Sequence, residues 1–396
     1  MRLILDPAVR LYGGGRILVL GTRIIRLSEH GPAALRALLA DTATPAQRRL
    51  GDHLIDAGFA HPRPGPRKLD ATVLIPVRDR PEELARCLAA ISGGSDPPYA
   101  NSRADLASGR ESISGGSDPP YVVVVDDGSL VPVRCEGARV VRRERSGGPA
   151  VARNEGLNYV ESEFVAFLDS DCVPPPDWIE RLGGHFDDPR VAAVAPRIRA
   201  ADGGRSPLDL GPQRRVRYLP SAALIVRRAA QPYFDPELRY GEDVDLIWRL
   251  EKAGWRFRYE PDVVVHHDER DRIKRRFMYG TSAAPLAQRH PGKIRHVVLR
   301  PWPVVTLALL PRPKLAAAVY LAHTVLLART LRNKGVPVRL APLWTATATV
   351  KTLAQFARLA TPYGAGVVFG HVRSKIRGLP TILGPSIHER SRHQAS

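Results

Sequence analysis

The chain has 396 residues, with 59 Lys and Arg against 40 Asp and Glu, which gives a formal net charge of +19. Hydrophobic residues make up 44% and charged residues 25%, so wholesale disorder, collagen and coiled coil are excluded and a folded globular protein is expected. The length predicts roughly two or three domains. The positive charge reflects either an arginine-rich codon bias or a partner that carries phosphates, a nucleotide or a lipid headgroup.

The three cysteines, Cys87, Cys135 and Cys172, form no CxxC pair. This pattern disfavours a disulfide framework and a structural zinc site, and it favours a reducing, cytoplasmic compartment. No uninterrupted apolar segment with a small-residue cleavage site occurs in residues 1–20, so we expect no secretory signal there.

A small first domain is expected over residues 1–64. Its elements are two strands of a hairpin at 16–20 and 23–27, around Gly21-Thr22, and two helices at 32–39 and 45–57, the second stopped by Gly58. The proline-rich segment 61–66 is interpreted as a semi-rigid linker to the next domain.

Strands and helices alternate in the second domain, residues 65–298. Apolar strands are expected at 71–75, 121–125 and 164–168, and helices at 81–91 and 150–160. This alternation predicts an α/β fold with a doubly wound sheet. The nine residues 91–99 recur identically as 113–121, so segment 91–120 is interpreted as a duplicated, mobile loop insertion without a role in chemistry.

A helical region is expected at 299–384, before a disordered tail at 385–396. Its apolar runs, 302–310 and 315–328, are shorter than the ~20 residues that a membrane-spanning helix needs. Two interpretations stay open for it. It is a helical appendage packed on the sheet, or it lies on a membrane with its basic residues toward anionic headgroups, namely Arg312, Lys314, Arg329, Arg332 and Lys334.

Pairs of carboxylates follow two of the predicted strands. Asp126 and Asp127 follow the first, where a carboxylate can accept hydrogen bonds from a nucleotide base or ribose, although Asp-Gly-Ser is also ordinary turn chemistry. Asp169 and Asp171 follow the second and, two residues apart on an extended chain, point the same way. Hard oxygen ligands of this kind suit Mg²⁺ or Mn²⁺.

A third acidic pair, Glu242 and Asp243, opens a helix that runs to Ala253. Acidic residues in a first helical turn serve as simple capping, or they aim a carboxylate into a cleft. The glycine-rich segment 146–154 also opens a helix and can approach a phosphate or a base. It matches neither the dinucleotide-binding nor the P-loop pattern.

Basic and imidazole groups follow a further predicted strand at 263–265. His266 and His267 form a structural pair, or one of them is an extra metal ligand. The basic cluster at 270–276 forms a solvated helix face, or it clamps a diphosphate.

Taken in order, five motifs resemble those of family 2 inverting glycosyltransferases with the GT-A fold, over about residues 69–298. They are Ile75-Pro-Val-Arg-Asp-Arg-Pro81, Asp126-Asp-Gly-Ser129, Gly148-Pro-Ala-Val-Ala-Arg-Asn154, Asp169-Ser-Asp171 and Gly241-Glu-Asp-Val-Asp245. Segments 220–224, 276–284 and 288–291 are similar to those of glycosyltransferases of the mycofactocin system. Residues 1–64 resemble the winged-helix-like peptide-binding domain of the pyrroloquinoline quinone chaperone type.

The resemblance implies roles for individual residues. The nucleotide-sugar-binding set that it implies is Pro76, Asp79, Asp126, Asp127, Arg153, Asn154 and Asp169, with Asp127 at the uridine end. It also implies a metal set of Asp169, Asp171 and His267, rather than His266, and it makes Asp243 the general base with Glu242 beside it.

The activity implied is transfer of glucose from a nucleotide sugar, UDP-glucose, with a divalent metal (Mn²⁺ or Mg²⁺). The implied acceptor is a peptide-derived redox cofactor, mycofactocin or its precursor, on which β-linked glucose chains are built. The alternative is a cytoplasmic enzyme at the inner face of the membrane that acts on a lipid or polysaccharide acceptor. The QxxRW signature of processive synthases is absent, which disfavours such a synthase. Nucleic-acid binding is disfavoured because residues 1–60 hold few aromatics and no basic recognition helix.

Overall fold

The computed structural model describes residues 2–21, 23–92, 121–204, 206–269, 271–294, 297–299, 301–359, 361–373 and 381–383. The chain forms two compact units, Pro64–Arg275 and the combination of Met1–Arg63 with Arg276–Ser396. Nearly all of the duplicated segment and the whole of the expected tail lie outside the described residues, so both interpretations stay predictions.

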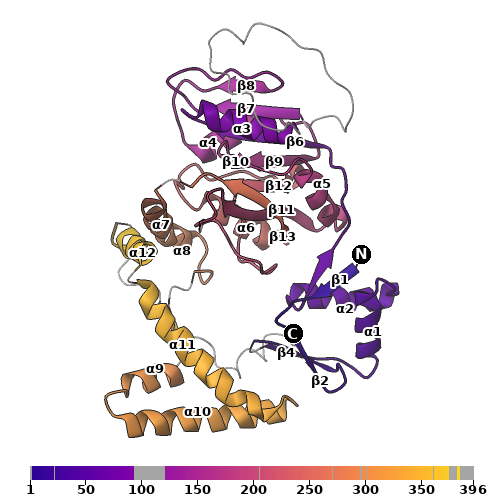
Figure 1. Ribbon diagram of the computed structural model, residues 1–396, viewed down its shortest axis with the longest axis vertical. Helices are drawn as coiled ribbons and strands as arrows, with labels where there is room; N and C mark the ends of the chain where they lie inside the picture. The colour runs from indigo at the N-terminus through magenta and orange to yellow at the C-terminus, as the bar shows by residue number, and fades with distance from the viewer. Residues whose placement is uncertain are drawn as a thin grey trace. The chain divides into compact units, whose positions relative to one another are not determined.

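Eight strands among the described residues of the Pro64–Arg275 unit form one sheet, in the order β10-β13-β11-β12-β9-β6-β7-β8 (Figure 1). They are β6 (Ala71–Val77), β7 (Tyr121–Asp126), β8 (Arg139–Arg142), β9 (Phe164–Leu168), β10 (Cys172–Val173), β11 (Val191–Ala200), β12 (Ala223–Arg227) and β13 (Arg256–His267). Strands β8, β7, β6 and β9 are parallel, whereas β12 is antiparallel to both neighbours and β10 to β13. The predicted α/β class is confirmed, with a mixed rather than an all-parallel sheet.

Helices cover both faces of this sheet, which explains why β6 is an almost continuous apolar run. Val73 and Ile75 pack in a cluster with residues of α3 (Pro81–Ile91) and α5 (Trp178–Gly183). Leu74 points to the other face and packs with residues of α4 (Pro149–Leu157) and α6 (Glu242–Lys252). Gly156 allows α4 to approach β6 closely, since a Cβ there would lie 2.6 Å from Leu74 Cδ1.

The direction of strand addition reverses at β6. The chain moves from β6 to β7 and β8 on one side, and it then places β9 on the other side of β6. In open α/β sheets, ligands bind outside the carboxyl ends of the strands at such a reversal. The residues that follow β6, β7 and β9 are therefore the first place to look for a site.

In the other unit, β1 (Arg2–Leu5) pairs with β5 (Ala60–Arg63), and β2 (Arg10–Tyr12), β3 (Ile17–Leu20) and β4 (Arg23–Arg26) form a second small sheet. The expected hairpin and the two expected helices, α1 (Gly31–Leu39) and α2 (Pro45–Asp56), are confirmed. The linker prediction is wrong for residues 61–63, which belong to β5, where buried His61 contacts Asp6 Oδ2 at 3.0 Å. Pro62 is tolerated because a two-stranded sheet has only edge strands.

The helical C-terminal region is confirmed. It contains α7 (Arg272–Thr281), α8 (Ala283–Arg289), α9 (Pro301–Ala308), α10 (Pro313–Asn333), α11 (Ala341–Leu359) and α12 (Pro362–Arg373), with the short helix η4 (Val338–Leu340) and the paired strands β14 (Val297–Leu299) and β15 (Thr381–Leu383). The first four residues of α7 belong to the Pro64–Arg275 unit.

Helix α10 extends beyond the predicted apolar run 315–328: it has 21 residues and contains an 18-residue window with a mean hydropathy of 1.2. By length and composition it is long and apolar enough to cross a membrane, and it alone passes that test within the described residues. The helix continues beyond the apolar run because nothing interrupts it before Gly335, whose φ is +71°. One side of α10 joins the N-terminal sheet, since Leu327 and Leu331 share a core with Ile17 and Val19.

Candidate active site

The acidic pair at the end of β7 organises two loops. Asp126 is fully buried and accepts hydrogen bonds from the backbone N–H groups of Ser129 (2.9 Å) and Val133 (3.1 Å) and from Arg142 (2.5 Å). Burial raises the pKa of Asp126, but these hydrogen bonds outweigh it and hold the pKa below its ordinary value. Asp126 therefore shapes the turn at 127–133.

Asp127 accepts hydrogen bonds from the glycine-rich loop before α4. The donors are Ser146 Oγ (2.7 Å) and the backbone N–H groups of Gly148 (2.8 Å) and Gly147 (3.0 Å), and Arg143 pairs with the same carboxylate. The predicted strand end and the predicted glycine-rich loop therefore meet through one side chain.

Asp79, after β6, is tied to the same region. Its φ is +53°, and its carboxylate accepts a hydrogen bond from Leu130 N–H (2.7 Å) while its own N–H donates to Ser129 Oγ (3.0 Å). Pro76 lies on β6 opposite Val125 of β7. The structure thus gathers Pro76, Asp79 and Asp127 at the carboxyl ends of adjacent parallel strands.

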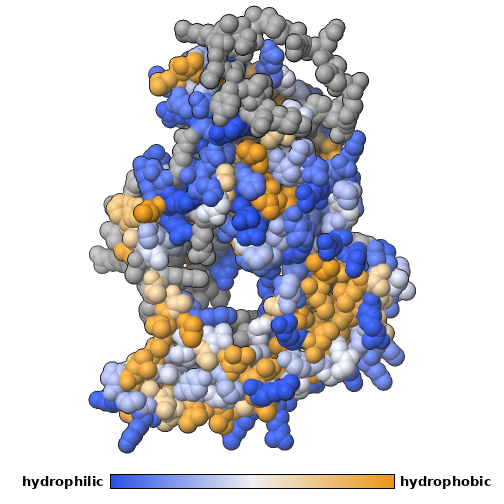
Figure 2. Space-filling model, viewed as in Figure 1, coloured by the Kyte–Doolittle hydropathy of each residue, from blue (hydrophilic) through white to orange (hydrophobic). Residues whose placement is uncertain are grey.

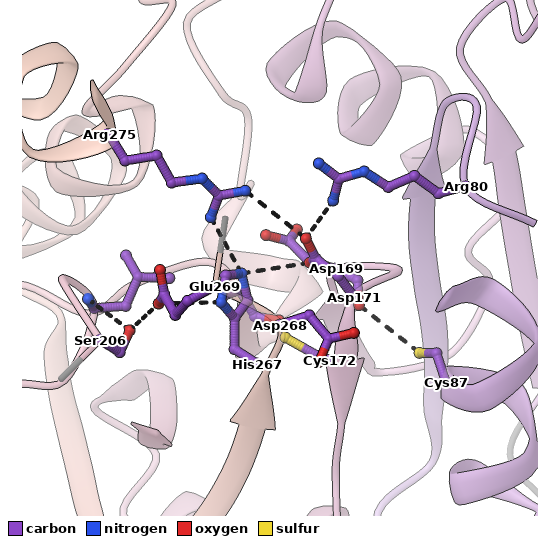
Figure 3. Close-up of polar contacts among 12 residues, drawn as sticks. Arg80, Cys87, Asp169, Asp171, Cys172, Ser206, His267, Asp268, Glu269 and Arg275 are labelled. Atoms are coloured by element: carbon purple, nitrogen blue, oxygen red, sulfur yellow. Dashed lines mark hydrogen bonds and ion pairs between the residues drawn. The ribbon is translucent and has the colours of Figure 1, made fainter. Parts of the chain in front are cut away.

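Asp171, after β9, is the centre of a second group (Figure 3). Its side chain is only 4% exposed; it pairs with Arg80, and Arg275 Nη2 lies 3.8 Å from it. His267, at the end of β13, places Nε2 3.4 Å from Asp171 Oδ1 and Nδ1 3.2 Å from Glu269 Oε1. Burial lowers the pKa of His267, but Glu269, Asp171 and Asp169 outweigh it and raise the pKa above its ordinary value. His266 is exposed, as strand alternation requires.

Three ligand atoms, from Asp171, Cys172 and His267, lie within 4.8 Å of one another. Cys172 is a poor candidate, because burial raises the pKa of its thiol, which donates to Ala222 O at 3.3 Å. A carboxylate and an imidazole remain, and this oxygen and nitrogen set fits a divalent ion such as Mn²⁺. Asp169 is outside this group, since its carboxylate faces Arg153.

Arg153, on α4, connects the end of β9 with the start of α6. Its guanidinium donates to Asp169 Oδ1 (2.6 Å) and Glu242 Oε1 (3.2 Å), and it lies 5.2 Å from the ring centre of Phe234. The side chain is 2% exposed. Burial lowers the pKa of Arg153, but the two carboxylates outweigh it and raise the pKa, so the group stays charged.

The neighbouring Asn154 is engaged by the backbone of Phe234. Its amide donates to Phe234 O (2.7 Å) and accepts from Phe234 N–H (2.9 Å). This predicted site residue therefore fixes the loop under Arg153.

The third acidic pair opens α6 after Gly241, whose φ is +80°. Asp243 is partly exposed and accepts hydrogen bonds from the N–H groups of Val244 (2.7 Å) and Ser221 (3.3 Å). Next to Ser221, Ala222 O accepts from the N–H of Asp169 at 2.9 Å, so segment 221–222 contacts both acidic pairs.

Burial perturbs both carboxylates of this pair. It raises the pKa of Glu242 to about 7, with the charge of Asp243 adding to the effect and that of Arg153 opposing it. Burial also raises the pKa of Asp243, whereas the two N–H hydrogen bonds and the charge of Arg153 lower it, and burial has the larger effect. Glu242 is buried and held by Arg153, whereas Asp243 keeps access to solvent.

The residues around Asp171 include Arg80, Arg275 and Cys172, which are not in the nucleotide-sugar, metal or base sets that the resemblance implies. Arg80 lies inside the motif 75–81, and Arg275 belongs to the basic cluster, so both carried a signal in the sequence. Cys172 carried none. Another member of the cluster, Arg272, pairs with Asp202, and Arg270 lies outside the described residues.

Parts of the chain are similar to known proteins. Residues 72–234 match the family model "Glycosyl transferase family 2". The pre-mycofactocin glycosyltransferase of Mycobacterium tuberculosis (strain ATCC 25618 / H37Rv) is 41% identical over 333 residues, which cover 74% of this chain and 64% of that protein. The chain thus matches less than two thirds of that relative's length.

A more distant relative is glycosyltransferase AglE of Haloferax volcanii, 23% identical over 272 residues, or 61% of this chain and 82% of that one. Among solved structures, a mannosyltransferase from Pyrobaculum calidifontis in complex with GDP-Man and Mn²⁺ superposes with a TM-score of 0.42 at 17% identity. That match covers 82% of this chain and 98% of the mannosyltransferase.

Proposed function

We propose that the chain, whose residues 72–234 match the glycosyl transferase family 2 model, transfers a hexose from a nucleotide-diphosphate sugar to an acceptor hydroxyl, with inversion at the anomeric carbon. The observation that carries the proposal is the bridge from Asp169 through Arg153 to Glu242, beside Asp243. It couples the acids at the end of β9 to the carboxylates at the start of α6.

Asp243 is the general base. Its carboxylate takes the proton from the acceptor hydroxyl as the hydroxyl oxygen bonds to the anomeric carbon and the bond to the diphosphate breaks. A raised pKa makes this carboxylate a stronger base than an exposed aspartate. Glu242 is a positioning residue, because its side chain is buried against Arg153. One base and one displacement convert an α-linked donor into a β-linked product.

Cationic groups around Asp171 stabilise the departing diphosphate. Arg80 and Arg275 are 29% and 24% exposed, so both guanidinium groups can reach an oxygen ligand as well as Asp171. Asp171 and His267, with Asp169 nearby, would hold a divalent ion, Mn²⁺ or Mg²⁺, which when bound neutralises charge on the diphosphate.

The nucleotide end of the donor is assigned to Pro76, Asp79 and Asp127. They lie at the ends of β6 and β7, next to the loop whose N–H groups bind Asp127. Asp126 and Asn154 act by holding the surrounding loops in place.

We assign the acceptor as a peptide-derived redox cofactor of the mycofactocin type, and the donor as UDP-glucose. The support is the 41% identity to a protein named for that activity. The three cysteines are free, which agrees with a reducing cytoplasmic compartment. A lipid or polysaccharide acceptor is the second candidate, favoured by the apolar helix α10.

The test is incubation of the purified chain with UDP-glucose, Mn²⁺ and either the cofactor precursor or a polyprenyl phosphate. Mass spectrometry should show hexose additions on the precursor, and proton NMR should show a β-anomeric linkage. Asp243→Asn should abolish transfer but still bind UDP-glucose, whereas Glu251→Gln, at the exposed end of α6, should retain transfer. Transfer to the lipid alone would replace the assigned acceptor, and an α-linked product would reject the single displacement.

A further inference from the structure

The net charge of the chain is carried by one segment. Residues 272–388 contain 19 Lys and Arg and not a single Asp or Glu, so this segment alone accounts for the formal charge of +19. Basic residues are spread over the whole chain, but outside this segment 40 Lys and Arg are balanced by 40 Asp and Glu, so the segment differs by its lack of acidic residues. The positive charge is therefore a property of the C-terminal helices.

The same helices expose large aliphatic side chains (Figure 2). Exposed examples on α9, α10 and α11 are Val305, Leu315, Leu321, Val325, Leu343 and Val350, which are 44–65% accessible. Single exposed aliphatic residues are ordinary, but a concentration of them over consecutive helices marks an interaction surface.

Helix α10 separates its residues into two faces. Ala316, Leu327 and Leu331 are buried on one face, and the last two pack with the N-terminal sheet. The opposite face exposes Leu315, Leu321 and Val325 by 51%, 61% and 51%. An amphipathic helix of a water-exposed domain would carry polar residues on that side.

Charges stand only at the two ends of this exposed apolar face. Lys314 precedes it and Arg329 follows it, and no Lys, Arg, Asp or Glu lies between them. At 1.5 Å per residue, the uncharged stretch is about 22 Å long. Long basic side chains at both ends of an apolar stretch can reach headgroups while the stretch contacts acyl chains.

The exposed face belongs to packed helices. The rings of Trp302, in the first turn of α9, and His323, on α10, stack with their centroids 5.7 Å apart. Thr324 Oγ1 of α10 donates to Thr345 Oγ1 of α11 at 3.2 Å. The aliphatic residues are thus presented on an ordered surface.

We propose that α9, α10 and α11 form a docking surface for an anionic lipid bilayer, with α10 lying in the plane of the interface. The in-plane orientation follows from the other face of α10, which is occupied by the N-terminal sheet. The positive charge of this segment, which contains no Asp or Glu, complements anionic headgroups. The exposed aliphatic side chains enter the boundary between headgroups and acyl chains. A nucleic acid would match the charge but not the aliphatic face, because such interfaces are strongly polar.

The test is co-sedimentation of the full chain with vesicles of phosphatidylcholine alone or mixed with phosphatidylglycerol. Binding should require phosphatidylglycerol and weaken with salt. Lys314→Gln/Arg329→Gln should weaken it about 25-fold, at roughly fivefold for each cation removed. Leu321→Ser/Val325→Ser should also weaken it, and melting curves should show that both variants fold.

Matched controls lie on the N-terminal part of the chain. Arg48→Gln/Arg49→Gln removes two exposed cations from α2, and Leu11→Ser removes an exposed leucine from β2, so both should bind vesicles like the unaltered chain. Equal binding to both vesicle types, unchanged binding of the α10 variants, or tighter binding to a DNA duplex than to vesicles would overturn the proposal. None of these readouts uses glycosyl transfer, so the proposed activity is tested independently.

Discussion

Arg153→Met removes the guanidinium that pairs with both Asp169, after β9, and Glu242, at the start of α6. Methionine keeps an apolar stem against Phe234 but leaves Glu242 buried without its counter-ion. Arg153 lowers the pKa of both Glu242 and Asp243, so its loss raises both. We expect the acid limb of the pH profile of kcat to move to higher pH.

The magnitude follows from the burial of the guanidinium, which is 2% exposed. Removing one partner of a buried ion pair costs about 3–5 kcal/mol of unfolding free energy. Glu242→Gln should cost only about 1 kcal/mol, because Arg153 still pairs with Asp169. The double variant, Arg153→Met with Glu242→Gln, has no buried carboxylate at position 242. Its loss of unfolding free energy should therefore be about 2 kcal/mol smaller than the sum of the losses in the two single variants.

The assay is a double-mutant cycle: urea unfolding and turnover are measured on the unaltered chain, the two single variants and the double variant. Turnover should fall about 100-fold in Arg153→Met, because the bridge sets the geometry of the base. Arg67→Met, which breaks an exposed pair with Asp187, should cost under about 1 kcal/mol and leave turnover unchanged. Additivity within about 0.5 kcal/mol would refute the reasoning, since it would mean that Arg153 and Glu242 do not interact.

Three further predictions concern protonation, metal binding and packing. Between pH 4.5 and about 7, folded Glu242 holds a proton that the unfolded chain has lost, so the unfolding free energy should fall as pH rises, by up to ~1.4 kcal/mol per unit; Glu242→Gln should flatten this slope in urea titrations at several pH values. Asp171→Ala should weaken Mn²⁺ binding at least tenfold by calorimetry, and an unchanged titration would remove it from the metal set. Gly156→Ala should cost about 1–3 kcal/mol in urea unfolding because its Cβ would overlap Leu74, whereas Gly14→Ala, with open space around it, should report only backbone strain.

The sequence was most informative where one physical requirement dominates. A strand buried on both faces must be continuously apolar, and β6 and β9 were therefore recognised, β9 with its bounds intact. The helix expected at 81–91 is α3, and the helix expected to open at Glu242 and run to Ala253 is α6. Strand β8 was missed because a short segment with an arginine at each end depends on partners distant in sequence. His61 was assigned to a linker because pairing with β1 leaves no local signal.

The acids of the candidate site were found in the sequence because each pair follows a strand or opens a helix. Their partners were not, because contacts such as Arg153 to Glu242 join residues far apart in the chain. The contacts of Asp126 are local instead, and they agree with the interpretation of Asp-Gly-Ser as turn chemistry. Sequence patterns locate groups at element ends, whereas their pairing depends on the order of strands in the sheet.

The most direct measurement of the central claim is mass spectrometry of the redox-cofactor pool in cells that lack this chain. Hexose-bearing forms should disappear, return when the unaltered chain is supplied, and stay absent when Asp243→Asn is supplied at the same level. Hexose-bearing forms that persist without the chain, or that Asp243→Asn restores fully, would contradict the assigned transfer and its base.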